Sequence, residues 1–406
     1  MALFDQLVQQ YDWYTRHVWG VVSHRHLSPA MLPAWSRFLH SYVVQPDQPT
    51  HLPFDIQLEI TTVCNLHCIM CRGALPMGPG KHMKLDTLKT LVDQLPFLYR
   101  VVPQGLGEPM LNPAIYGMVE YAAAKGCAVE FHTNGMFLDR KRIARLMDAG
   151  LYALTVSVDG STPATFETIR AGAKMDRVVA NLETLREMKR ERGTDLPHVR
   201  FHVVVTKPGL PEVPDIIRLA ARLGVEVVIL SPLHIFAESM IPLAVEPDEW
   251  RGLYKYQRMA RELGVTLFFI PWEPVEPVLV AGGRPGWTGQ PTPDGAAQDA
   301  IAPQAESRGE VGALGKRRAP CRYPWTGLYV TVEGDILPCS WALASGRKGL
   351  GNVYTDDLAS VWWGEEYQAF RHQLTDASQP LPDICATCPR VANYAGHSDA
   401  PVPQPA

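Results

Sequence analysis

The feature that most constrains the fold of this chain is a regular alternation of strand-like and helix-like segments between residues 54 and 270. Short runs rich in β-branched and aromatic residues alternate with longer stretches whose apolar residues repeat at helical spacing. Three of these stretches end in glycine, which readily adopts the backbone conformation that follows a helix. The alternation predicts an α/β fold in which helices cover a parallel sheet or a partial barrel. The expected strands span residues 54–61, 99–105, 128–134, 153–159, 199–206 and 225–231, followed by a helix over 248–263 and a strand over 265–271.

The sequences before and after this core have a different character. The first residues carry apolar side chains at mostly helical spacing, which predicts a helical cover over the barrel; a surface that docks the substrate is the alternative. Glycine and proline accumulate after the barrel, as is typical of a mobile insertion or linker. The predicted organisation is an N-terminal helical segment (1–53), a barrel (54–280), a flexible insertion or linker (281–318), a small α+β region (319–390) and a disordered tail (391–406).

Charge and hydropathy argue against several classes of partner. Lys and Arg number 38 and Asp and Glu 42, so the formal net charge is −4, which does not favour a nucleic-acid or polybasic membrane surface. We find no continuous apolar stretch long enough to cross a membrane, and the first residues lack the apolar core of a signal peptide. We therefore expect a cytoplasmic protein. Cytoplasmic thiols stay reduced, so the eight cysteines are expected to bind metal or take part in chemistry.

Three cysteines follow the first predicted strand at the spacing C-x3-C-x2-C: Cys64, Cys68 and Cys71. Three thiolates on one short loop can bind three irons of a 4Fe–4S cubane and leave the fourth iron open to another ligand. A zinc site usually takes a second pair of ligands at a distance, and none lies within this loop. Spacing alone therefore favours iron–sulfur, with zinc binding and ordinary thiols as the alternatives.

Four short motifs at the ends of successive predicted strands resemble those of the radical S-adenosylmethionine (radical SAM) enzymes. The string LEITTVCNLHCIMC (58–71) resembles the cluster-binding signature of that family. GLGEP (105–109), TNG (133–135) and SVDG (157–160) stand where the family has its further motifs, and Arg170 lies in a stretch typical of the helix after the fourth strand. The resemblance covers residues from about 54 to 270 and implies a partial (β/α)6 radical SAM barrel.

This resemblance also implies how the cofactors bind. In the family, three cysteines hold a 4Fe–4S cluster, and the amino and carboxylate groups of SAM chelate its open iron. Reduction of the cluster, for which we expect a flavodoxin or ferredoxin, cleaves SAM to a 5′-deoxyadenosyl radical that removes a hydrogen atom from the substrate. Leu106 replaces one glycine of the family's GGEP motif. The residues that match SAM-binding positions are Gly105, Gly107, Glu108, Asn134, Ser157, Asp159 and Arg170.

Side-chain alternation along the strands predicts which polar residues face the barrel interior. Asn134 and Asp159 have inward parity, and His132 shares the parity of Asn134, which places it near SAM. A histidine satisfied within the core is the alternative for His132. Glu59 and Gln104 are further interior candidates.

Four more cysteines, at the spacing C-x17-C-x45-C-x2-C, lie in the small C-terminal region: Cys321, Cys339, Cys385 and Cys388. Four thiolates can close a zinc site or ligate every iron of a 4Fe–4S cluster. The surrounding sequence resembles the SPASM or twitch region of radical SAM enzymes, which implies one auxiliary 4Fe–4S cluster; the cysteine spacing is close to that of 2-deoxy-scyllo-inosamine dehydrogenase. We expect the remaining cysteine, Cys127, to be a small core residue rather than a hydrogen-atom donor.

A fully ligated auxiliary cluster indicates a net oxidation, in which a base removes a proton and the cluster accepts an electron. The candidate bases are His132, His202, Tyr329 and Glu59. Ser340 stands where sulfatase-maturing relatives carry an aspartate, which argues against that activity.

Two substrate classes, and one function of a different kind, remain open. The substrate is either a small polar molecule, such as a cyclitol or sugar whose alcohol is oxidised, or a ribosomally made peptide. Many peptide-modifying relatives carry a winged-helix recognition domain before the barrel, so the short helical segment here favours the small molecule. The other hypothesis is a non-catalytic scaffold whose cysteines hold zinc, although a scaffold has no use for motifs that bind SAM.

Overall fold

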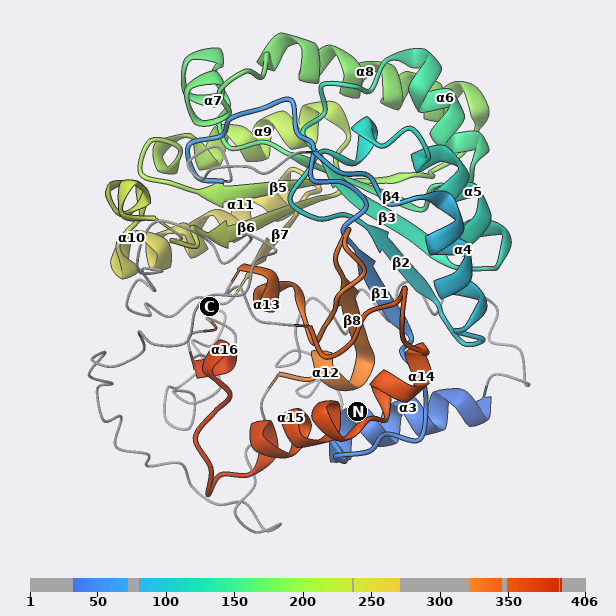
Figure 1. Ribbon diagram of the computed structural model, residues 1–406. Coiled ribbons are helices and arrows are strands. Elements are labelled where there is room, and N and C mark those ends of the chain that lie inside the picture. Colours follow the sequence, from blue (N-terminus) through green and yellow to red (C-terminus); the bar gives the residue numbers. More distant parts are fainter. Residues whose placement is uncertain are drawn as a thin grey trace.

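The computed structural model describes residues 32–71, 80–235, 237–270, 321–344, 349–386 and 388. Their strands form one sheet in the order β7-β6-β5-β4-β3-β2-β1-β8-β9, in which every neighbouring pair is parallel except β8 and β9 (Figure 1). The predicted α/β class and parallel sheet are therefore confirmed. The strands are β1 (Asp55–Leu58), β2 (Arg100–Pro103), β3 (Ala128–Thr133), β4 (Ala153–Ser157), β5 (His198–Val205), β6 (Val227–Pro232), β7 (Thr266–Phe269), β8 (Gly327–Val330) and β9 (Ile336–Leu337).

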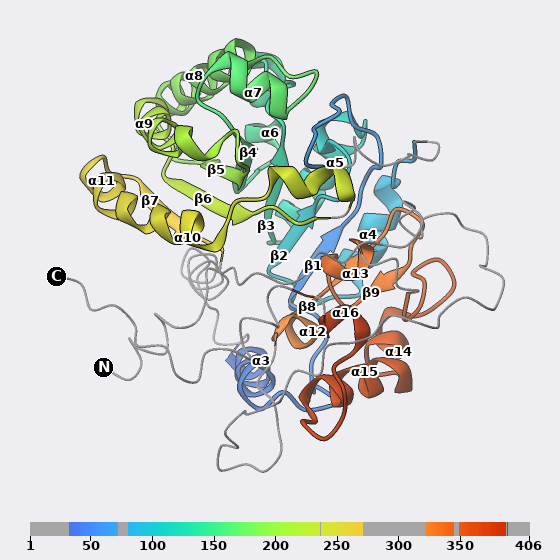
Figure 2. The same cartoon turned by 90° about the vertical axis from the view of Figure 1, so that its left-hand side faces the viewer.

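Helices alternate with the first seven strands and lie along one side of the sheet (Figures 1 and 2). Gly126, Gly150 and Gly224 follow three of them with φ of +92°, +84° and +71°, so the predicted helix ends are confirmed. None of the helices described combines the length and apolar character needed to span a bilayer. The helices are α4 (Leu85–Asp93), α5 (Ile115–Ala124), α6 (Arg140–Asp148), α7 (Pro163–Ile169), α8 (Met175–Arg192), α9 (Val213–Leu223), α10 (Pro247–Arg251) and α11 (Tyr256–Glu262).

Two helical predictions are wrong. The helix expected over 248–263 is interrupted, because a 3-10 turn, η6 (Gly252–Lys255), separates α10 from α11. Arg170 does not lie within a helix: α7 ends at Ile169, and Arg170 opens the turn that leads to α8. The backbone of this turn reaches a φ of +96° at Gly172, a conformation that cannot continue a right-handed helix. The predicted insertion (281–318) and the predicted tail (391–406) lie outside the described residues, as do residues 1–31.

The C-terminal region continues the barrel sheet, which the sequence did not predict. β8 pairs with β1 in parallel, with Asp55 opposite Gly327 and Gln57 opposite Tyr329. β9 then turns back against β8, and the turn between them contains Gly334 at a φ of +91°. The short helices of this region are α12 (Tyr323–Thr326), α13 (Ser340–Ala344), α14 (Leu358–Trp362), α15 (Glu365–Thr375) and α16 (Asp383–Ala386). A cysteine-bearing segment distant in sequence thus becomes the neighbour of the strand that leads into the first cysteines.

A helix within the predicted N-terminal helical segment, α3 (Leu32–Val44), packs beside this C-terminal region (Figure 1). The indoles of Trp325, Trp362 and Trp363 donate hydrogen bonds to three backbone carbonyls of the segment after α3, at 2.6, 2.6 and 2.7 Å. The buried Arg371 guanidinium donates to the carbonyls of Pro324 and Trp362 at 3.0 and 2.8 Å. The tryptophan bonds fasten the two chain segments to each other at the base of β1 and β8, and the Arg371 bonds hold the elements of the C-terminal region together.

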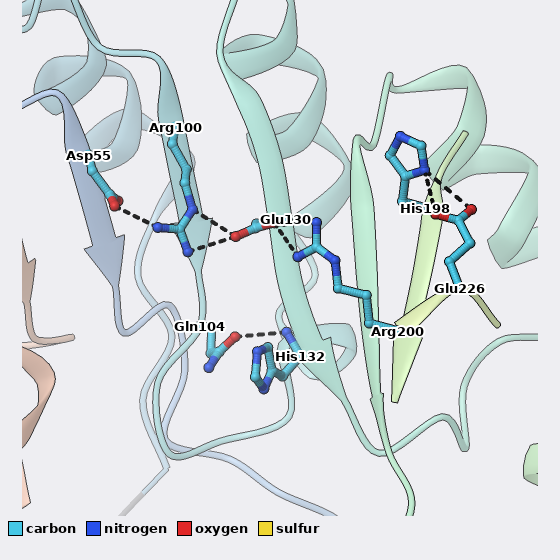
Figure 3. Close-up of polar contacts among 8 residues, drawn as sticks. All are labelled: Asp55, Arg100, Gln104, Glu130, His132, His198, Arg200 and Glu226. Carbon is cyan, nitrogen blue, oxygen red and sulfur yellow. Dashed lines mark hydrogen bonds and ion pairs between the residues drawn. The ribbon is translucent and has the colours of Figure 1, made fainter. Parts of the chain in front are cut away.

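A row of buried charges crosses the inward face of the sheet near the amino ends of the strands (Figure 3). Arg100 bonds to Asp55 at 2.6 Å and to Glu130 at 2.7 Å, and the other oxygen of Glu130 accepts from Arg200 at 2.9 Å. Two carboxylates and two guanidinium groups balance in charge. Removing one member of a buried ion pair leaves its partner buried without a counter-charge, at a cost of about 3–5 kcal/mol. We call Asp55, Arg100, Glu130 and Arg200 the ion ladder.

Candidate functional site

The loop that leaves β1 carries the first three cysteines and rests on the turn between α7 and α8. Within the loop, the backbone N–H of His67 donates to Ala171 O at 2.9 Å, and that of Ile69 donates to Ile169 O at 3.0 Å. Cys71 N–H donates to Cys68 O at 3.2 Å, which turns the chain between these two thiols. The loop is therefore held by backbone bonds to an element more than ninety positions further along the sequence.

Burial makes the thiolate forms of these cysteines unfavourable without a cation. Desolvation raises the pKa of Cys68 to about 12, while the nearby charge of Arg170 opposes that rise. Burial also raises the pKa of Cys64, to which the Glu108 charge contributes. Thiolates in such a place need a bound cation, and the irons of a cluster supply positive charge at each sulfur. The donor set therefore fits the predicted cluster.

Arg170 forms a buried ion pair with Asp159, one of the other predicted SAM residues. Arg170 Nε lies 2.6 Å from Asp159 Oδ2, and Asp159 Oδ1 accepts from the backbone N–H of Val204 at 2.7 Å. Burial raises the pKa of Asp159, and the Arg170 charge works against that rise. The pair connects the ends of β4 and β5 to the cysteine loop.

The GLGEP segment packs directly on the backbone of the cysteine loop. Gly107 N–H donates to Thr61 O at 3.2 Å, and Glu108 N–H donates to Val63 O at 2.8 Å. A Cβ on Gly107 would lie 2.5 Å from Thr61 O, and one on Gly105 would lie 2.3 Å from Glu59 Cγ. Both glycines are thus required for this close approach, whereas the intervening leucine is exposed and tolerated.

The buried Glu108 carboxylate joins the second motif to the third. It accepts from Thr133 Oγ1 and the Asn134 N–H, both at 2.7 Å, and from Met110 N–H at 3.1 Å. Burial raises its pKa, and these hydrogen bonds oppose the rise. Because a carboxylate has about four acceptor positions, an amino group that reached Glu108 would find about one of them open.

Two asparagines that the sequence analysis did not single out complete the frame. Asn65, next to Cys64, accepts at its Oδ1 from Asn134 Nδ2 at 2.9 Å. Asn112 Nδ2 donates to Ile60 O at 2.7 Å and to a second carbonyl at 3.0 Å. Asn65 could have been suspected from its place inside the cysteine motif; no sequence signal marked Asn112.

His132 and His202, two of the predicted bases, meet on the inward face of the sheet. Their ring centroids lie 5.2 Å apart, and the backbone N–H of His132 donates to Gln104 Oε1 at 2.8 Å. Burial lowers the pKa of His132 to about 4 and lowers that of His202 well below its usual value, so both are neutral near pH 7. The last residue of β4, Ser157, stands opposite His202 in the strand register.

Glu59 and Tyr329, the other predicted bases, lie where β1 meets β8. Glu59 accepts from Leu106 N–H at 3.5 Å through one oxygen and from Val332 N–H at 3.3 Å through the other. Its buried carboxylate therefore links the GLGEP segment to the turn after β8. Tyr329 is buried in β8.

The C-terminal cysteines come from three separate elements. Cys321 precedes α12, Cys339 follows β9, and Cys385 and Cys388 lie in and just after α16. Burial raises the pKa of Cys339 to about 12, and the charges of Cys321 and Cys388 add to this, so these thiols are neighbours. Among the described residues no three His, Cys, Asp or Glu side chains are gathered closely enough for a single metal ion. A cubane presents its irons at separate corners and accepts more widely spaced thiolates.

Cys127 stands apart from both groups. It is buried, and its Sγ lies 3.4 Å from the carbonyl oxygen of Leu98, near the amino end of β3. Its predicted place in the core is confirmed.

Family comparisons agree with this arrangement. A model of the radical SAM superfamily matches residues 58–220, and a model of the SPASM iron–sulfur cluster-binding domain matches residues 321–389. The chain therefore contains a radical SAM domain and a C-terminal SPASM domain, and these domains imply SAM and 4Fe–4S clusters as cofactors.

Individual relatives extend the comparison. The AdoMet-dependent heme synthase of Methanosarcina barkeri is 31% identical over 43% of this chain and 49% of its own length, so the chain spans about half of that relative. The mycofactocin maturase MftC of Mycolicibacterium smegmatis is 24% identical over 88% of this chain and 79% of its own length. Streptococcus suis SuiB bound to S-adenosylmethionine has a similar fold, with a TM-score of 0.60, 14% identity, and 84% of this chain and 71% of SuiB covered.

Proposed function

We propose that this protein is a cytoplasmic radical SAM enzyme that performs a net oxidation on a ribosomally made peptide. The observation that carries the proposal is the convergence of the GLGEP, TNG and SVDG segments on one cysteine loop. GLGEP bonds to the loop through the backbone of Gly107 and Glu108, and TNG bonds to it through Asn134. SVDG is joined to the loop indirectly, because its Asp159 pairs with Arg170 in the turn on which the loop rests. A structural scaffold would not need four strand ends arranged around a partly exposed trio of thiols.

We assign the cofactor contacts as follows. Cys64, Cys68 and Cys71 would hold the cluster, and when bound the cluster and SAM supply the electron and the radical that begin the reaction. Gly105 and Gly107 keep the GLGEP backbone close to the loop, so its carbonyls can receive an amino group. The buried Arg170–Asp159 pair keeps a guanidinium beside the thiols, where positive charge favours their ionised form.

A neutral histidine is our candidate for the proton acceptor. His202 and His132 are both held neutral by burial, and a neutral imidazole can accept a proton. Of the four predicted bases, these two meet each other on the inward face, whereas Glu59 is already used as a link between two backbone segments. We expect His202 to act as base because it stands opposite Ser157 at the end of β4.

The auxiliary cysteines support an oxidative outcome. The segments that carry Cys321 and Cys339 flank the β8–β9 hairpin, and β8 is the direct neighbour of β1. Four thiolates would occupy every iron of one cluster, which suits an electron acceptor rather than a substrate ligand. We therefore propose that the electron left on the substrate passes to this second centre.

A peptide substrate takes its support from a relative named a maturase, the mycofactocin maturase MftC, whose similarity extends over 88% of this chain. Coverage alone does not separate the two substrate classes, because the AdoMet-dependent heme synthase of Nitratidesulfovibrio vulgaris matches 86% of this chain at 27% identity. Oxidation of a small polar molecule remains the second candidate, supported by the spacing of the four C-terminal cysteines.

Anaerobic reconstitution followed by analysis of iron, sulfide and zinc tests the proposal. We expect about eight irons and matching sulfide per chain, and dithionite-driven cleavage of SAM. The variant Cys68→Ala should lose the cleavage, and Cys127→Ala, a matched control on a buried cysteine outside both clusters, should keep it. Bound zinc without sulfide would overturn the proposal.

A further inference from the structure

An aromatic contact joins the barrel to the auxiliary-cysteine segment. His234 lies two residues beyond the end of β6, and Trp341 lies in α13, two residues after Cys339. Their ring centroids are 5.1 Å apart, and the ring planes meet at 62° in an edge-to-face contact. Both side chains are only partly buried, so neither is sealed within the core.

The same contact continues a row of aromatic rings that begins with His132 and His202 on the inward face of the sheet. His234 follows β6, which pairs with β5, the strand that carries His202, and the charge of His234 contributes to lowering the pKa of His202. The ring of His202 in turn lies 5.2 Å from that of His132. His132 is on β3 and His202 on β5, with β4 between them, so flat strands would separate them by about 9.6 Å. Their closer approach means that both rings lean over β4 on its inward face.

The charged groups around this row are already neutralised. Arg100 and Arg200 are paired within the ion ladder, and Arg170 is paired with Asp159. Figure 3 shows His132 and Gln104 lying beyond the ladder, towards the carboxyl ends of the strands. A carboxylate or phosphate entering here would lose its hydration and meet guanidinium groups that already bind carboxylates. An uncharged group would instead meet imidazole, amide and indole groups that donate or accept hydrogen bonds.

We propose that His132, His202, His234 and Trp341 form a substrate-binding wall that selects an uncharged hydrogen-bonding group, such as a peptide amide or a polyol, over an anionic one. This inference rests on the proposed function and adds His234 and Trp341 as residues that determine specificity. Trp341 gives the wall a flat apolar face next to the auxiliary cysteines, and the histidines give it its polar positions.

A binding experiment on the anaerobically reconstituted full chain with SAM tests this wall. The probes are an acetylated and amidated Gly-Ser-Gly peptide, the same peptide phosphorylated on serine, and myo-inositol, each followed by equilibrium dialysis. We expect the uncharged peptide or the polyol to bind at least about tenfold tighter than the phosphopeptide, a difference of about 1.4 kcal/mol. Tighter binding of the uncharged peptide would indicate that the wall binds an amide, and tighter binding of myo-inositol would indicate that it binds a polyol.

Variants assign the binding to the wall. Trp341→Ala and His234→Ala should each lower the affinity for the uncharged probe about fivefold or more. Trp341→Phe keeps an aromatic face and should lower this affinity less. Trp363→Ala is the matched control, because its indole bonds to Pro49 O elsewhere in the same region; it should leave probe affinity unchanged. His234→Ala lies outside the auxiliary region, so it keeps the test valid if Trp341→Ala fails to load its clusters.

The possible outcomes separate this inference from the proposed function. Equal or tighter binding of the phosphopeptide, unchanged affinity in Trp341→Ala and His234→Ala, or binding of none of the three probes would overturn the wall. Dithionite-driven SAM cleavage is measured on the same wild-type samples without any probe. Its absence would overturn the proposed function, whereas its presence together with the wrong binding pattern would overturn only the wall.

Discussion

The two groups of cysteines are assembled in opposite ways. The first group lies within eight residues of one loop, and neighbouring strand ends hold that loop by backbone bonds. The second group comes from three elements separated by up to 45 residues and depends on β8 joining the barrel sheet. A local motif can therefore predict the first cluster site from the sequence, while the second cluster site forms only once the whole chain has folded. The two centres should consequently respond differently to mutation.

The largest difference between the two cysteine groups is expected in SAM cleavage and product formation. Cys68→Ala should reduce SAM cleavage to background, because two thiolates on this loop cannot hold a cubane with one open iron. The double variant Cys385→Ala, Cys388→Ala should retain cleavage but form no oxidised product. Anaerobic assays of 5′-deoxyadenosine and product compare the two, with Cys127→Ala as the control. Normal product formation by the double variant would contradict the role of electron acceptor.

In the barrel, breaking the ion ladder should produce the largest loss of stability. Glu130→Ala leaves Arg100 and Arg200 buried without their shared carboxylate, so we expect a loss of about 3–5 kcal/mol in the free energy of unfolding. Urea denaturation of the apoprotein measures it.

The matched control for this variant is Glu226→Ala. Its exposed carboxylate pairs with His198 at 3.1 Å, and removing it should cost less than about 1 kcal/mol. Equal effects of the two substitutions would show that the ladder does not stabilise the fold.

The C-terminal region should be sensitive at Arg371. Arg371→Met keeps much of the apolar packing but leaves the carbonyls of Pro324 and Trp362 without their donor, at a cost of about 1–3 kcal/mol. Because this arginine fastens the region at the base of β8, the auxiliary cluster should be lost before the first one. Iron content and cluster spectra on heating follow both centres; simultaneous loss would contradict their independence.

A loss of stability of similar size is expected where GLGEP packs on the first cysteine loop. Gly107→Ala places a methyl group 2.5 Å from Thr61 O and must displace the backbone, at a cost of about 1–3 kcal/mol. SAM affinity should fall with stability. Leu106→Ala, at the exposed neighbouring position, is the control and should change neither quantity. Unchanged SAM binding in Gly107→Ala would show that this close approach does not position the cofactor.

Much of the barrel could be predicted because its information is local. Strand alternation and helix-ending glycines predicted all seven strands, and motif spacing brought Cys64, Glu108 and Asn134 to the same end of the sheet. The pairing of β8 with β1 could not be predicted, since it joins segments about 270 residues apart and no periodicity reports a partner.

The partners of buried polar groups were equally hidden. The pairing of Arg170 with Asp159 could not be predicted, because a buried guanidinium takes the nearest carboxylate that the fold supplies. The ion ladder does have a sequence signal. Asp55, Arg100 and Glu130 are charged residues within otherwise apolar strands, and they share inward parity, which indicates buried ion pairs.

The most direct test of the account is the formation of 5′-deoxyadenosine by anaerobically reconstituted, dithionite-reduced protein supplied with SAM. We predict that the wild-type chain forms it and that the variant lacking Cys64, Cys68 and Cys71 does not. If wild-type protein with a full complement of iron and sulfide forms none, the loop after β1 does not hold a radical-generating centre, and the proposed function is wrong.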